Sequence, residues 1–243
     1  MSGPVEYYPP TTDESRLHAL EYAVVDCETT GGSPARGHRV TEIAVVRVDR
    51  DGRVLDRVDT LVNPMRAIPR AITRITHIDD SMVSDAPLFA EIAPRVQQAL
   101  AGAVFVAHNA PFDLRFVEWE MKRGDFAPPK GKVLCTARLA RKLLPEMRSR
   151  SLDALIHRWA IPCDARHRAL GDARATVDVL VRLLDMAAER GIGVWAELDR
   201  FLSTRKKLET NPPRGMRLIT FESGRCSSSD LRSKRLWTAM IPP

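Results

Sequence analysis

Two acidic side chains, Asp26 and Glu28, stand one residue apart in the segment VVDCETTGG (residues 24–32). They end an apolar run that is typical of a buried strand, and residues i and i+2 of a strand face the same side. Both carboxylates should therefore point into one small volume, where like charges repel each other unless a positive charge lies between them. A divalent cation is the simplest such charge, so the pair predicts a metal site if other segments supply more ligands.

Two later segments supply further acids and a histidine. HNAPFD (108–113) leaves a second apolar run and brings Asp113 to the start of a helix. HRALGD (167–172) brings His167 and Asp172 to the start of a long helix. Taken singly, each acid is also explained by the favourable field of a helix N-terminus, and the histidine as a surface residue. Together they offer a set of oxygen ligands and one imidazole that titrates near neutral pH.

The elements that must position these residues follow from the apolar spacing. Strands are expected at 21–28, 39–49, 53–64, 103–108 and near 133–136, with a hairpin turn at RDGR (50–53). Helices are expected at 88–100, 111–124, 136–144, 151–159 and 168–190, and residues 68–87 are expected to form a loop with one helical turn. This order predicts an α/β fold: a mixed β-sheet flanked by α-helices, with the acids at the strand ends.

The charge is unevenly distributed along the chain, whose net charge is +6. From residue 200 to residue 243 there are ten Lys or Arg against three acids, so the remainder is close to neutral. We therefore expect a disordered N-terminal arm at 1–18, a main domain at 19–192, and a basic, partly disordered C-terminal extension at 193–243.

Neither the N-terminus nor the hydropathy indicates export or a membrane. No stretch approaches the ~20 apolar residues of a membrane span, and the first residues lack the pattern of a signal peptide. The chain is therefore expected to be cytoplasmic. The cysteines form no CxxC pair, which favours reduced thiols: Cys27, Cys135, Cys163 and Cys226.

Three motifs together resemble a known family, the DEDDh 3'-5' exonucleases, and within it the DnaQ-like epsilon-subunit type of bacterial DNA polymerase III. The resemblance covers roughly residues 20–190 and implies a ribonuclease H-like fold. The matching patterns are Asp26-x-Glu28-Thr29-Thr30-Gly31, His108-Asn109-x-x-Phe112-Asp113 and His167-x-Ala169-x-x-Asp172.

The resemblance implies two Mg²⁺ or Mn²⁺ ions in the site. By analogy Asp26 bridges both metals, Glu28 and Asp172 complete the site that activates water, and Asp113 acts on the second metal. His167 is the expected general base, since an imidazole can take a proton from metal-bound water at neutral pH. Two metals ~3.5 to 4 Å apart would activate the water and stabilise both the transferring phosphate and the leaving 3'-oxygen.

A further set of residues is expected to hold the 3' end of the substrate strand. Two alternatives stay open: Thr-Thr-Gly is also an ordinary turn, and Phe112 could pack beneath its helix instead of stacking on a base. The expected substrate-binding residues are Thr29, Thr30, Gly31, His77, Ile78, His108, Asn109 and Phe112.

The expected function is a metal-dependent 3'-5' exonuclease that releases nucleoside monophosphates from single-stranded or mispaired DNA 3' ends, in proofreading or repair. The expected partner is a single-stranded nucleic acid end, DNA in preference to RNA, and a DNA polymerase subunit is a further candidate. Two alternatives remain: a free-standing exonuclease acting on RNA 3' ends, and a catalytically silent binding module associated with a polymerase.

Overall fold

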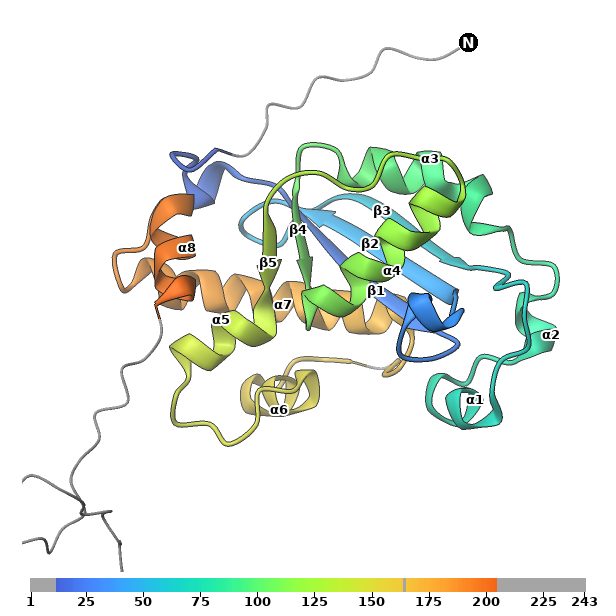
Figure 1. Ribbon diagram of the computed structural model, residues 1–243. Helices are drawn as coiled ribbons and strands as arrows, with labels where there is room; N and C mark the ends of the chain where they lie inside the picture. Colours follow the sequence, from blue (N-terminus) through green and yellow to red (C-terminus); the bar gives the residue numbers. More distant parts are fainter. Residues whose placement is uncertain (1–11, 164, 205–243) are drawn as a thin grey trace, which may run out of the picture. The chain divides into compact units, whose positions relative to one another are not determined.

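A five-stranded sheet lies at the centre of the computed structural model, which describes residues 12–163 and 165–204 (Figure 1). The strand order is β3-β2-β1-β4-β5, with β1 antiparallel to β2 and parallel to β4. The strands are β1 (Tyr22–Thr29), β2 (Val40–Val48), β3 (Val54–Leu61), β4 (Val104–Ala107) and β5 (Val133–Cys135). The sheet is therefore mixed, and with helices on both faces it confirms the expected fold class.

Helices cover the two faces of the sheet. Figure 1 shows α3 and α4 along one face and the long helix α7 along the other, with α5 and α8 beside α7. The helices are α1 (Arg70–Thr76), α2 (Asp80–Val83), α3 (Phe89–Leu100), α4 (Ala110–Arg123), α5 (Thr136–Leu143), α6 (Leu152–Trp159), α7 (Ala169–Ala188) and α8 (Trp195–Ser203). Two short 3-10 turns, η1 (Leu17–Ala19) and η2 (Pro34–Arg36), precede β1 and β2.

Strand β1 contributes side chains to the hydrophobic cores on both faces of the sheet, because its side chains alternate between the faces. Tyr22 and Val24 belong to the core under α7, whereas Ala23 and Val25 belong to the core under α3 and α4. Continuing this alternation places Asp26 and Glu28 on the α7 face. The local pattern of one strand thus directs both acids towards the helix that carries Asp172.

The segment expected to be a loop at 68–87 contains two short helices, α1 and α2, instead of one helical turn. Its own small core consists of Ile68, Ile78 and Val83. Each helix has two turns or fewer, which is too short for the apolar period to show in the sequence.

The folded unit extends beyond the expected boundaries at residues 19 and 192. Leu17 and Trp195 are buried in the core under α7, and a backbone bridge joins Arg16 to Val194. The apolar side chains at both ends account for this packing. The rest of the expected arm and basic extension, residues 1–11 and 205–243, lies outside the described residues. Among the helices described, none is long and apolar enough to cross a bilayer.

Candidate active site

Three carboxylates meet at the end of β1. Asp26 and Glu28 come from β1 and Asp172 from the first turns of α7, and one oxygen of each lies within 4.8 Å of the others. Asp172 is 6% exposed. The donors are all hard oxygens, which are the ligands that Mg²⁺ and Mn²⁺ prefer.

Asp113 reaches the same region from α4. Strand β4 ends at Ala107, and Asn109, with φ of 84°, turns the chain into α4. Asp113 in the first turn then accepts a hydrogen bond from the backbone N–H of Cys27 at 3.0 Å. Because Cys27 lies between Asp26 and Glu28, this bond fixes Asp113 beside the pair, although its carboxylate is outside the group of three.

The site carries more negative charge than its surroundings compensate. Burial, followed by the charges of Asp172 and Glu42, raises the pKa of Glu28 to about 7. Burial raises the pKa of Asp113 to about 8, although its hydrogen bond from Cys27 opposes the change. Burial and the neighbouring carboxylates also raise the pKa of Asp26 well above its usual range. A divalent cation would remove this penalty, so the residues present fit a metal site.

A buried glutamate on the neighbouring strand anchors the start of α7. Glu42 of β2 lies opposite Glu28 in the sheet register and is 3% exposed. Its carboxylate accepts from Arg168 Nη2 at 2.6 Å and from the backbone N–H of Ala169 at 2.8 Å. These bonds fix the first turn of α7 against β2 and so place Asp172 over β1.

A second buried ion pair anchors α4. Arg39, just before β2, donates from Nε and Nη2 to the two carboxylate oxygens of Glu120 at 2.7 and 2.8 Å. The backbone N–H of Val40 donates to the same carboxylate at 3.3 Å. Glu120 lies two helical turns after Asp113, so this pair holds the helix that carries the fourth acid.

One arginine contacts the acid cluster directly. Arg166 donates to Asp172 and, from Nε, to Asp153 of α6 at 2.7 Å. Arg166 sits in the turn before α7, and that turn touches the helix closely, since a Cβ at Gly171 would lie 2.0 Å from the carbonyl oxygen of Ala165. The glycine of HRALGD thus permits the turn to pack on α7.

His167 lies in the same turn, exposed and with a left-handed backbone (φ 59°). Among the described residues its side chain forms no hydrogen bond, in contrast to the side chains of Asp113 and Asp172. The role of His167 as general base remains a prediction.

The geometry agrees with the comparisons with known proteins. A family model described as Exonuclease, the RNase T family, matches residues 23–180. The chain belongs to the DEDDh exonuclease superfamily. The matched range contains both β1 acids, Asp113, His167 and Asp172.

Relatives and a solved structure support this exonuclease assignment. The chain is 41% identical over 197 residues to a Mycobacterium tuberculosis protein named as a bifunctional exonuclease/endonuclease, covering 78% of this chain and 30% of that protein. It is 44% identical over 184 residues to a DNA polymerase III subunit epsilon-like protein of Rhodobacter capsulatus, covering 74% and 26%. Exonuclease X, solved in complex with 5' overhanging duplex DNA, is 28% identical with a TM-score of 0.58, covering 75% of this chain and 99% of that chain. The chain thus spans less than a third of the curated relatives named here.

The Thr-Thr-Gly segment of the exonuclease domain forms a tight turn at the end of β1. The Thr29 hydroxyl donates to the carbonyl oxygen of Gly31 at 2.8 Å, and the Thr30 hydroxyl accepts from the backbone N–H of Arg39 at 3.0 Å. A Cβ at Gly31 would lie 2.4 Å from the ring of His38, so only glycine fits. The hydroxyls therefore stabilise the turn, and contact with a 3' end remains a prediction.

His108 and Asn109, two predicted substrate-binding residues before α4, differ in the hydrogen bonding of their side chains. His108 is tied at both ring nitrogens, to the Thr136 hydroxyl and to the carbonyl oxygen of Arg150, each at 2.9 Å. Burial lowers the pKa of His108. Because a carbonyl oxygen only accepts, Nε2–H donates to Arg150. This ring joins β4 to the segment before α6. Asn109 is exposed, with no capping bond from its side chain, and is available to a substrate.

The other three residues predicted to contact the substrate, His77, Ile78 and Phe112, differ in the exposure of their side chains. His77 is exposed at the C-terminus of α1, whereas Ile78 is fully buried in the α1–α2 core. The Ile78 side chain packs in the small core beneath the segment that carries His77, and contact of either residue with a base remains a prediction. Phe112 is half-buried, with Phe116 at 5.1 Å between ring centroids and Arg115 5.2 Å over its ring.

Five charged residues that position the acids carry no local sequence signature. They are Arg39, Glu42, Glu120, Arg166 and Arg168. The sequence gives a hint only for Arg166 and Arg168, which stand on either side of His167. The other three residues lie far along the chain from their partners.

Proposed function

We propose that this protein is a metal-dependent 3'-5' exonuclease that releases nucleoside monophosphates from the 3' ends of single-stranded or mispaired DNA. The observation that carries the proposal is the meeting of Asp26, Glu28 and Asp172 within 4.8 Å, with Asp113 held beside them through Cys27. Few structural roles require four carboxylates in one buried place.

The four acids and His167 have different roles in the proposed hydrolysis. Asp26, Glu28, Asp113 and Asp172 would hold two divalent ions, Mg²⁺ or Mn²⁺. When bound, such ions lower the pKa of a water molecule and neutralise charge that develops on the phosphate. His167 accepts the proton of the attacking water, and its exposed position lets it return the proton to solvent.

Ion pairs and hydrogen bonds within the chain hold the four acids in place without a metal ion. Arg166 neutralises Asp172, and Glu42 and Glu120 fix the helices that carry Asp172 and Asp113.

DNA is proposed as the substrate because one relative is named epsilon-like and Exonuclease X was solved with duplex DNA. A role in proofreading or repair, and an association with a polymerase subunit, are proposed on the name of the epsilon-like relative. An RNA 3' end is the competing substrate, since hydrolysis at these acids does not itself require a particular sugar.

The test compares 5'-labelled oligonucleotides with matched, mispaired, single-stranded and RNA 3' ends. With Mg²⁺ or Mn²⁺ we expect a ladder of products shortened by single nucleotides, fastest on single-stranded and mispaired DNA. Asp26→Asn should abolish the ladder. Faster shortening of RNA would replace DNA as the substrate, and absence of any product in both metals would contradict the proposed activity.

A further inference from the structure

A second concave region is lined in part by the connection between β1 and β2. It is a cavity of about 500 Å³ between η2, the segment after β3 and the C-terminal half of α4. None of the four acids lines it. Its lining residues are Pro34, Ala35, Gly37, Arg39, Pro64, Met65, Arg66, Ala67, Trp119 and Arg123.

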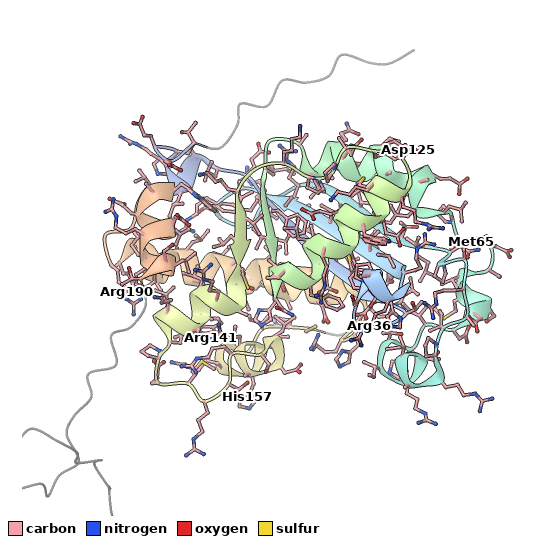
Figure 2. The ribbon with its side chains drawn as sticks, viewed as in Figure 1. Arg36, Met65, Asp125, Arg141, His157 and Arg190 are labelled. Carbon is pink, nitrogen blue, oxygen red and sulfur yellow. The ribbon has the colours of Figure 1, made fainter. Side chains whose placement is uncertain are left out.

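Two large apolar side chains are exposed at this cavity. Trp119 of α4 is 44% exposed and Met65 is 67% exposed, the latter on a left-handed backbone (φ 52°). Figure 2 shows Met65 on the outer edge of the molecule and Arg36 on the loop before β2. Exposed apolar side chains that gather at one hollow favour a binding surface over a chance arrangement.

The charge of the cavity is positive. Of its three arginines, Arg39 is paired with Glu120, which leaves Arg66 and Arg123. Arg66 donates to the carbonyl oxygen of Gly37. Within residues 12–163 and 165–204, neither Arg66 nor Arg123 forms an ion pair with an acid. An exposed indole and two guanidinium groups that line one cavity suit a nucleobase and its adjacent phosphates.

We propose that this cavity binds a nucleotide of the substrate strand upstream of its 3' end. The base stacks on Trp119, and Arg66 and Arg123 contact the adjacent phosphates. This inference rests on the proposed function, because the strand that is hydrolysed at the acids must continue over the surface. The site is sequence-tolerant, since every base has a π face and phosphates are common to all nucleotides.

The position of the cavity agrees with one continuous strand. Glu28 lies near the end of β1, and the connection that follows β1 lines the cavity with Pro34, Ala35, Gly37 and Arg39, so the segment that begins beside the acid cluster also reaches the cavity. Even at the duplex rise of ~3.4 Å per nucleotide, twelve nucleotides cover ~40 Å. That is roughly the diameter expected of a domain of this size, so a twelve-nucleotide strand can reach the cavity.

The test measures binding of dT3 and dT12 to the full chain in EDTA, by competition against a fluorescent oligonucleotide. We expect Trp119→Ala to weaken dT12 binding by roughly 5- to 100-fold, as expected for the loss of one stacked base, and to leave dT3 binding unchanged. Trp119→Phe should restore most of the affinity. Arg123→Ala should lower the salt slope for dT12 by about 0.7.

Arg141→Ala is the matched charge control for Arg123→Ala. Arg141 is exposed on α5, and Figure 2 shows it well separated from Met65. It should change neither affinity nor slope. Equal dT12 affinity in wild type, Trp119→Ala and Arg123→Ala would overturn the proposal and assign the cavity to a protein partner.

The two proposals fail in different ways. If wild type and Trp119→Ala both shorten dT3 at the same rate but also bind dT12 equally well, the exonuclease stands and the cavity proposal fails. If wild type shortens no oligonucleotide but binds dT12 in a Trp119-dependent manner, the cavity proposal stands and the exonuclease fails.

Discussion

Glu42 and Arg168, 126 residues apart in the chain, form an ion pair at the start of α7, in which the partly exposed Arg168 donates from Nη2 to Oε1 of the buried Glu42 at 2.6 Å. The other carboxylate oxygen accepts from the backbone of Ala169. Glu42 thus resembles a fifth acid of the cluster by position, because it faces Glu28 across the sheet, but its oxygens are occupied in holding α7. The distinction between ligand and anchor comes from these hydrogen bonds.

Replacement of this anchor should cost both stability and activity. Glu42→Gln removes the charge and one of the acceptors, so the free energy of unfolding should fall by about 1–3 kcal/mol in urea titrations. Turnover should fall as well because Asp172 loses its fixed position. Asp185→Asn, which breaks an exposed pair with Arg50, should cost about 1 kcal/mol or less. Equal losses in the two variants would show that Glu42 is no special anchor.

The metal-free protein should become less stable as pH rises. Burial and nearby carboxylates raise the pKa of Glu28 to about 7, and burial raises that of Asp113 to about 8, whereas such groups titrate near ~4 in an unfolded chain. Between about pH 4 and pH 8 the folded state therefore holds more protons than the unfolded state. The free energy of unfolding consequently falls with rising pH across this window.

Urea titrations at pH 5, 6, 7 and 8 in EDTA measure this slope. Glu28→Gln should make it shallower, since that site no longer ionises. Addition of Mg²⁺ at pH 8 should restore stability, because the cation takes the place of the protons. A free energy of unfolding that stays constant or rises with pH would contradict the uncompensated charge in the site.

The role proposed for His167 predicts a loss of rate. His167→Ala should lower turnover by about 10²- to 10⁴-fold with little change in KM, and the acidic limb of the pH-rate profile should disappear. The control is His157→Ala, which changes an exposed histidine of α6 that is labelled in Figure 2. Wild-type turnover and profile in His167→Ala would leave the histidine without a catalytic role.

The basic extension predicts a salt-dependent contribution to binding. Residues 205–243 carry nine Lys or Arg and three acids. Their deletion should weaken single-stranded DNA binding at low salt and reduce the salt slope by about 0.7 for each phosphate that the extension neutralises. Turnover on short, saturating substrates should stay the same, because all the proposed catalytic residues lie upstream. An unchanged slope would favour a protein partner for the extension.

Local sequence patterns predicted the parts of the fold that depend on local rules. The alternation of β1 predicted that Asp26 and Glu28 face the same side, and the structure places both on the side of α7. The apolar period located α7, and the start of α4 at Pro111 located Asp113, because a helix of several turns repeats its pattern.

The remaining features depend on tertiary contacts that no local pattern encodes. The ion pairs of Glu42 with Arg168 and of Arg39 with Glu120 join residues that are far apart in the chain. The local sequence around Ile78 is typical of an exposed segment, but Ile78 is buried because α1 and α2 fold onto it. Its contact with a base was inferred from the resemblance and remains a prediction.

Calorimetric titration of Mn²⁺ into the full chain tests most directly whether the four acids form a metal centre. We expect two ions per wild-type chain, the same binding in Asp185→Asn, and loss of at least one ion or a tenfold or greater loss of affinity in Asp26→Asn. The folded state of Asp26→Asn is verified by its unfolding transition, which should lie at or above that of the metal-free wild type because repulsion among the acids is relieved. Binding of Mn²⁺ to folded Asp26→Asn with wild-type stoichiometry and affinity would contradict the metal centre.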